Sequence, residues 1–166
     1  HPFVCGRWSF MHNGQIGGFD RLRRHLEATI CDDLYDRLEG TTDSELLFLM
    51  MLQEGLDDDP HAAAERATAR VQAVAGKLGV ETTVRLTAAF SDGATLYAIR
   101  YATDAHAPTL YMSQAHGKGR CLVSEPFDRD GASWHAIPPS SFVTVTRAGV
   151  DIRDFSPEPP RYALAV

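Results

Sequence analysis

The hydrophobic pattern changes its period partway along the 166-residue chain, and this change limits the folds available to it. Up to about residue 80, apolar residues recur every three or four positions, a spacing typical of amphipathic helices. From Val84 onward they alternate with polar residues at period two, which indicates strands. Helices followed by strands in hairpins predict an α+β domain with its helices grouped against a largely antiparallel sheet.

The helical part of the sequence predicts three helices. The first begins at Phe19, the second opens at Thr42 and the third starts with Pro60 and ends at Gly79. In the second helix, residues 46–52 are all apolar, so other elements are expected to cover it on most sides. The third helix is expected to bury one stripe of side chains, formed by Ala64, Ala67, Val71, Val74 and Leu78.

The strands are predicted by alternation and by turn residues. A short strand over residues 7–11 is expected to end at Asn13-Gly14, because this dipeptide favours tight turns. Residues 84–91 and 95–101 flank Asp92-Gly93 and predict a hairpin. The other strand-like runs are residues 109–113, 120–124, 141–147 and 150–155.

Charge and composition narrow the class of ligand. A net charge of -6 argues against a nucleic-acid or anionic-membrane partner, since both select clustered Lys and Arg. The odd set Cys5, Cys31 and Cys121 has no CxxC pair, which favours free thiols in a reducing cytoplasm. His106 and His116 lack the spacing of metal ligands, so we expect no metal and no cofactor. A small-molecule ligand fits this composition best.

Two interpretations are open for His12-Asn13-Gly14. The first is a plain turn between a strand and the next element. The second is an oxyanion hole, in which the Asn13 side-chain amide and the Gly14 backbone N–H converge on the oxygen of an acyl-transfer intermediate. Glycine suits the second role because no side chain blocks the approach of a substrate to the backbone.

The run Thr42-Asp43-Ser44-Glu45 also has two interpretations. As a capping box, Thr42 and Glu45 would each accept from the other's backbone N–H, and Asp43 would favour the positive end of the helix. Alternatively, Asp43 faces a pocket and binds the α-ammonium group of an amino-acid substrate. The two roles are compatible.

Together, "HPF" at residues 1–3, "HNG" at residues 12–14 and "TTDSE" at residues 41–45 resemble the class II glutamine amidotransferase domain, an N-terminal-nucleophile hydrolase. The runs "SDGATLYAIRY", "LVSEPFD" and "WHAIPPSSFVTV" are similar to its stand-alone members, a group that includes the γ-glutamyl hydrolases of ergothioneine synthesis. The resemblance implies a four-layer αββα sandwich. It also implies that Asn13 and Gly14 form the oxyanion hole and that Asp43 binds the substrate's α-amino group. Thr42 would line the same pocket. His12, which is grouped with the substrate-binding residues, and His1 are expected to support the site or to pack around it.

One departure from this family changes what is expected of the chain. The family's nucleophile is a Cys at the very N-terminus, and its carboxylate-binding Arg also lies upstream of "HPF". We therefore interpret residues 1–166 as the C-terminal two thirds of the domain, without its first strands, and expect it to be inactive alone.

The favoured function is cleavage of the side-chain amide of glutamine or a γ-glutamyl amide through a thioester, with ammonia passing to a separate enzyme if it is transferred at all. The rival is a catalytically inactive relative that binds a γ-glutamyl ligand or a protein. Other acyl donors, such as penicillin or a bile-acid amide, use related scaffolds, but Asp43 at the head of the helix favours a substrate with a free α-amino group.

Overall fold

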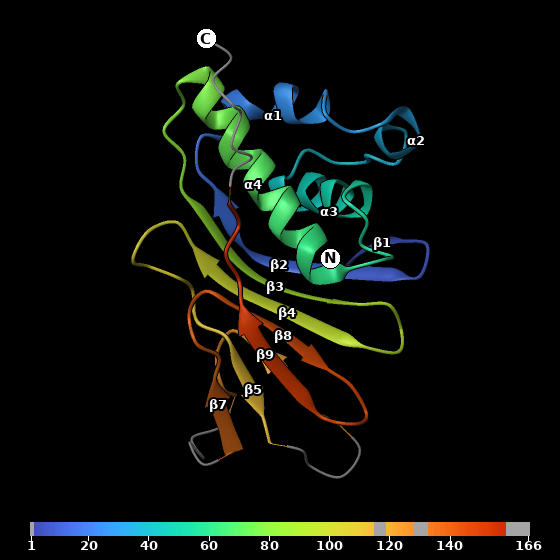
Figure 1. Ribbon diagram of the computed structural model, residues 1–166, viewed down its shortest axis with the longest axis vertical. Coiled ribbons are helices and arrows are strands. Elements are labelled where there is room, and N and C mark those ends of the chain that lie inside the picture. The colour runs from blue at the N-terminus through green and yellow to red at the C-terminus, as the bar shows by residue number, and fades with distance from the viewer. Residues whose placement is uncertain (1, 115–118, 128–132, 159–166) are drawn as a thin grey trace. The chain divides into compact units, whose positions relative to one another are not determined.

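The computed structural model describes residues 2–114, 119–127 and 133–158. The chain divides into two compact units. The sheet unit comprises residues 1–15 and 84–155, and the helical unit comprises residues 16–83 and 156–166. Figure 1 shows both, with the helices and strands labelled. The predicted α+β class is confirmed, whereas the four-layer arrangement stays a prediction.

The main sheet of the sheet unit has six strands in the order β1-β2-β3-β4-β8-β9, with β1 and β9 at its edges (Figure 1). Every pairing whose register is described within it is antiparallel. The predicted hairpin is confirmed as β3 and β4, where Phe90 lies opposite Tyr97. The strands are β1 Phe3–Cys5, β2 Trp8–Ile16, β3 Val84–Ser91, β4 Leu96–Ala102, β8 Ser141–Val145 and β9 Val150–Asp154.

Strand β2 corrects one prediction. The tight turn expected at Asn13-Gly14 is absent, because β2 continues through both residues to Ile16. The chain turns after the strand instead, at Gly17-Gly18, where Gly18 has a φ of 69°. Glycine adopts this left-handed conformation without steric cost, so Gly17-Gly18, and not Asn13-Gly14, is where the chain turns after the strand.

One face of the main sheet carries a cluster of aromatic rings. The centroids of Phe90 and Tyr97 lie 5.2 Å apart, and Trp8 lies 6.1 Å from Phe90. Phe10 and Phe142 lie 6.2 Å and 6.0 Å from Phe90. These separations are typical of stacked and edge-on aromatic pairs. The cluster therefore joins β2, β3, β4 and β8 through side-chain contacts on this face.

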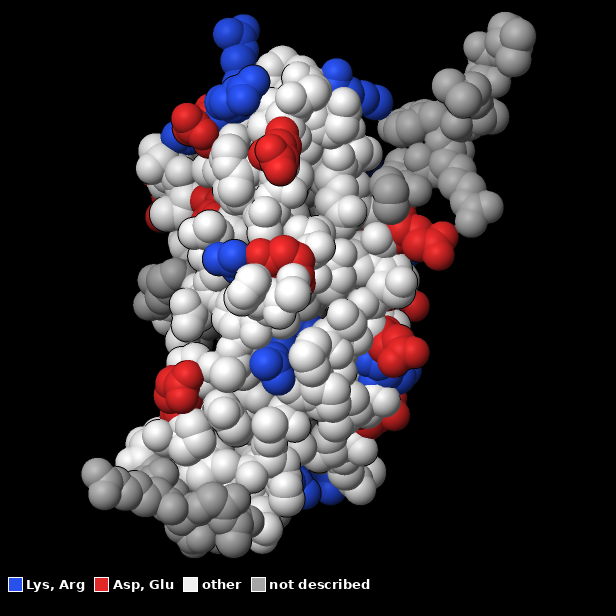
Figure 2. Space-filling model, turned by 90° about the vertical axis from the view of Figure 1, so that its left-hand side faces the viewer, with Lys and Arg blue, Asp and Glu red and all other residues white. Residues whose placement is uncertain are grey.

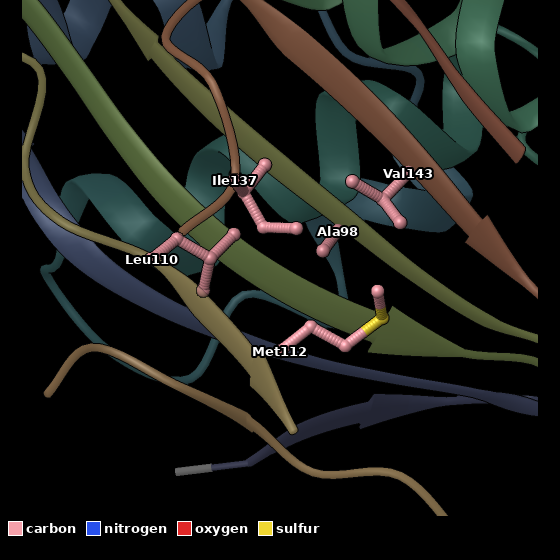
Figure 3. Packing of buried hydrophobic residues seen from close by; sticks show 5 residues of the cluster. All are labelled: Ala98, Leu110, Met112, Ile137 and Val143. Carbon is pink, nitrogen blue, oxygen red and sulfur yellow. The ribbon is translucent and has the colours of Figure 1, made fainter. Parts of the chain in front are cut away.

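The opposite face of the main sheet packs on a second sheet of three strands, in the order β6-β5-β7. Its strands are β5 Tyr111–Ser113, β6 Leu122–Val123 and β7 Trp134–Ala136. Figure 3 shows the apolar contact between the two sheets, in which Leu110, Met112 and Ile137 meet Ala98 of β4 and Val143 of β8. All five side chains are buried, so the sheet unit has a core of its own.

The helical unit contains the three predicted helices and a short fourth one. The helices are α1 Phe19–Glu27, α2 Asp32–Tyr35, α3 Asp43–Gln53 and α4 Pro60–Leu78. Asp59 caps α4 by accepting from the N–H groups of His61 and Ala62, and Gly79 ends it with a φ of 61°. The sequence signals for both ends of α4 are thus confirmed.

Helices α3 and α4 differ in how well their burial was predicted. In α3, Leu46 to Met51 are each at most 2% exposed, as the unbroken apolar run requires. In α4 the expected stripe is wrong at its C-terminal end, since Leu78 is 37% exposed and Val74 is only partly buried. Ala75, which lies four residues after the buried Val71, is buried instead.

Charged side chains are mixed on the surface. Over the described residues of the face in Figure 2, Lys and Arg are interspersed with Asp and Glu. Among the described residues, no helix has both the length and the hydrophobicity needed to cross a membrane.

Candidate functional site

Gly14 lies unusually close to the neighbouring strand. A Cβ atom placed on Gly14 would be 2.1 Å from the carbonyl oxygen of Arg85 and 2.5 Å from Nε2 of His12. The same His12 Nε2 donates to the Arg85 carbonyl oxygen over 3.2 Å. Only glycine fits between these two groups. Glycine is therefore required at this position because the neighbouring strand is close, and not because the chain turns.

The Arg85 side chain is held in place by Asp104. Its Nη2 donates to Asp104 Oδ2 over 2.7 Å. This hydrogen bond lowers the pKa of Asp104 from 3.8 to about 2, and the backbone N–H of His106 and the positive charge of Arg85 act in the same direction. The same contact raises the pKa of Arg85. Arg85 thus contacts Asp104 through its side chain and His12 through its backbone carbonyl.

Asn13 lies on the other side of β2 from His12 and Gly14, since side chains alternate along a strand. It is exposed, as are its two neighbours on that side, Met11 at 54% and Gln15. The Asn13 amide is therefore accessible, and Gly14 is exposed as well. Both groups can be approached by a ligand from solvent.

Asp43 begins α3 and is partly buried. Its Oδ2 accepts from the backbone N–H of Ile16 over 2.8 Å, and its Oδ1 accepts from the hydroxyl of Ser44 over 3.2 Å. Each carboxylate oxygen has a second lone pair, so the group keeps capacity for a further donor. Ile16 follows Gly14 by two residues along β2. A residue missed by the sequence reasoning, Ile16, thus orients the predicted ligand-binding carboxylate.

The predicted capping box is half right. Thr42 caps α3, with its Oγ1 accepting from the N–H of Glu45 over 3.2 Å. Glu45 does not return the bond to Thr42. Its carboxylate accepts from Glu39 N over 2.9 Å and from Gly40 N over 2.8 Å. Sequence spacing predicted the cap but could not reveal the loop that competes for the Glu45 carboxylate.

The predicted site residues fall into two groups. His12, Asn13 and Gly14 lie together on β2 in the sheet unit, whereas Thr42 and Asp43 lie together at the start of α3 in the helical unit. His1 lies outside the described residues.

The described cysteines and acidic or imidazole groups suggest no alternative centre. Cys5, Cys31 and Cys121 are free thiols that end β1, precede α2 and precede β6. Over the described ranges, which omit His116, no group of three or more His, Cys, Asp or Glu is arranged to hold a metal ion.

A cavity of about 650 Å³ in the helical unit lies apart from these groups. It runs along α4, and none of the predicted site residues lines it. Its two arginines, Arg66 and Arg70, are both bound to Glu54, Arg70 through the carboxylate and Arg66 through the backbone carbonyl as well as the carboxylate. This cavity is therefore separate from the candidate site residues.

Comparison with known proteins identifies relatives of one kind. No protein-family model matches the chain. The probable glutamine amidotransferase DUG3 of Saccharomyces cerevisiae is 27% identical over 186 aligned residues, which cover 89% of this chain and 52% of DUG3. The chain therefore spans about half the length of that curated relative.

Two solved structures extend the comparison. Glutamine phosphoribosylpyrophosphate amidotransferase from B. subtilis is 15% identical, with a TM-score of 0.62 over 90% of this chain and 29% of its own, and shares the fold. A glutamine aminotransferase class-II domain protein from Silicibacter pomeroyi superposes with a TM-score of 0.88. It is 45% identical over 95% of this chain and 71% of its own. Because this identity extends over nearly all of one chain and most of the other, the protein belongs to the class II glutamine amidotransferase domain family.

Proposed function

We propose that the protein containing this chain is an amidohydrolase that cleaves the side-chain amide of glutamine or a γ-glutamyl amide. Family membership is the observation that carries the proposal. The exposed side-chain amide of Asn13 and the backbone N–H of the sterically restricted Gly14 support this proposal, because they are two adjacent hydrogen-bond donors. An acyl-transfer intermediate needs two such donors for its oxyanion.

The proposed reaction begins with a thiolate from a Cys upstream of residue 1. The thiolate attacks the amide carbon, and the resulting oxyanion is held by Asn13 and Gly14. The C–N bond then breaks, and the nitrogen takes up a proton and leaves as ammonia or an amine. Water finally hydrolyses the thioester and releases the free thiol.

Substrate recognition is assigned to the start of α3. Asp43 carries a carboxylate whose orientation is fixed by the Ile16 N–H. We assign it to the α-ammonium group of the substrate, with Thr42 beside it and His12 supporting Gly14 from within the sheet unit. The free thiols fit a reducing compartment such as the cytoplasm, and any ammonia acceptor is a separate enzyme.

The experiment is a glutaminase assay on the full natural polypeptide, measuring glutamate and ammonia released from L-glutamine and γ-glutamyl amides. Asn13→Ala should lower kcat by roughly 10²-fold or more, as expected for loss of one oxyanion donor. Gln15→Ala is the matched control, because Gln15 is exposed on the same side of β2 and has no assigned role.

Substrate binding is tested in the same assay. Asp43→Asn should raise KM for glutamine. Asp33→Asn is the control, because it makes the same charge change at an exposed position of α2 and should leave KM unchanged. Undiminished turnover in Asn13→Ala would remove that residue from the mechanism. A natural protein that lacks an upstream Cys and releases no glutamate would instead be a γ-glutamyl-ligand or protein-binding relative.

A further inference from the structure

Glu45 is a buried carboxylate that the proposed reaction does not use. It lies in the first turn of α3 and is only 6% exposed. Burying a carboxylate is costly unless hydrogen bonds satisfy its oxygens. Here both oxygens accept from consecutive backbone N–H groups, Oε1 from Glu39 and Oε2 from Gly40. Both hydrogen bonds therefore require a side chain with two acceptor oxygens at position 45.

The loop that Glu45 binds is also held from its other side. The carbonyl oxygen of Gly40 accepts from Arg23 Nη2 of α1 over 3.4 Å, and Arg23 is itself bound to Glu27 over 2.5 Å. A Cβ on Gly40 would lie 2.8 Å from Glu45 Oε2, so a larger residue at position 40 would displace the Glu45 carboxylate. We call this set of contacts, made by Glu45 and Arg23 to residues 39 and 40, the loop clamp.

The loop clamp sits directly before the residues proposed to bind substrate. Only Thr41 and Thr42 separate Gly40 from Asp43. Glu45 also donates its backbone N–H to the Thr42 side chain, so the same residue binds the chain at three positions that precede Asp43. The position of the Asp43 backbone therefore depends on Glu45 as well as on the helix.

We infer that Glu45 is a positioning residue for substrate recognition, acting through the loop clamp to hold Asp43 where it meets the α-ammonium group of glutamine. This inference rests on the proposed function of Asp43. Glu45 itself touches no substrate. Its effect should therefore appear in KM for substrates with an α-amino group and not in kcat.

The test compares Glu45→Gln with wild type in the full natural polypeptide. Glutamine keeps the shape of the side chain but places an NH₂ group against a backbone N–H, donor against donor. KM for L-glutamine should rise roughly tenfold, in line with the loss of one charge-assisted hydrogen bond, with kcat nearly unchanged. Glutaramate, which is glutamine without the α-amino group, should show the same kcat/KM in variant and wild type.

A second variant and a physical measurement distinguish the positioning role of Glu45 from a folding defect. Gly40→Ala strains the loop clamp from the loop side and should raise KM in the same way. Hydrogen exchange at the Glu39 and Gly40 amides should accelerate in Glu45→Gln. Glu39→Gln is the matched control, because Glu39 is exposed and contributes only its backbone to the clamp.

The outcomes separate this inference from the function on which it rests. If Asp43→Asn raises KM for glutamine but Glu45→Gln and Gly40→Ala do not, the positioning role is overturned and the proposed function stands. Equal losses with glutamine and glutaramate also overturn it, since they indicate a general structural defect. If Asp43→Asn leaves glutamine affinity unchanged, the role of Asp43 fails and this inference fails with it, even where the exchange data confirm the clamp.

Discussion

Replacing Gly14 with alanine tests the close approach of β2 to β3. The added Cβ would sit 2.1 Å from the Arg85 carbonyl oxygen, 2.9 Å from its carbonyl carbon and 2.5 Å from His12 Nε2. Unstrained Cβ atoms keep at least 3.0 Å from such neighbours. The backbone of β2 or β3 must therefore move by about 1 Å, a large fraction of the roughly 4.8 Å between adjacent strands.

The cost follows from two separate losses. Forcing an extra carbon into a packed site costs about 1 to 3 kcal/mol. Displacing the strand also breaks the His12–Arg85 hydrogen bond, worth about 0.5 to 1.5 kcal/mol net. We therefore expect Gly14→Ala to lower the free energy of unfolding by about 1.5 to 4.5 kcal/mol. Turnover should fall as well, because the Gly14 N–H moves with the strand.

The assay is urea unfolding followed by tryptophan fluorescence, with the midpoint compared at constant m-value. Gly76→Ala is the control with the opposite sign. Gly76 lies exposed in α4, nothing lies within 4 Å of its added Cβ, and its φ is not positive, so alanine should stabilise the helix by about 0.5 to 1 kcal/mol. An unchanged midpoint in Gly14→Ala would show that the strand accommodates a side chain, and would refute the close-approach argument.

Three further predictions concern stability. Asp104, which is 31% exposed, has its pKa lowered to about 2 by Arg85, so its stabilising contribution is complete above about pH 4 and disappears as the pH falls toward 2. The difference in Tm between wild type and Asp104→Asn should shrink over that interval, and also in high salt; a difference independent of both would contradict the ion pair. Thr42→Ala should cost about 1 kcal/mol by urea unfolding, with Thr42→Ser restoring most of it, since the cap uses only the hydroxyl. Leu47→Ala in the fully buried part of α3 should cost about 2 to 5 kcal/mol, and a smaller loss would mean that the surrounding side chains close the cavity.

Local signals predicted most of the secondary structure. Pro60 and Gly79 bracket α4 as expected, and Asp92-Gly93 joins the two strands that alternate on either side of it. These features depend on neighbouring residues alone, so the sequence is sufficient to reveal them. The strands β1 and β7, of three residues each, were not predicted.

The error at Asn13-Gly14 has a different cause. The dipeptide favours a turn in isolation, but the Arg85 carbonyl lies where any larger residue would place its Cβ, so glycine is needed in an extended strand. The preference of a dipeptide is worth little against the hydrogen bonds of a strand inside a six-stranded sheet. Glycine is therefore required at position 14 by the close approach of the neighbouring strand and not by the turn that the dipeptide predicted.

The sequence by itself determined the family, the α+β class and the identity of the candidate site residues, because motif order and hydrophobic period are properties of the chain alone. The partners of those residues were decided only by tertiary structure. Asp43 is oriented by Ile16, and Glu45 turns from its expected cap toward the loop at Glu39 and Gly40. These bonds join groups that are 27, 6 and 5 residues apart, and a carboxylate accepts from whichever donors the folded chain brings within reach.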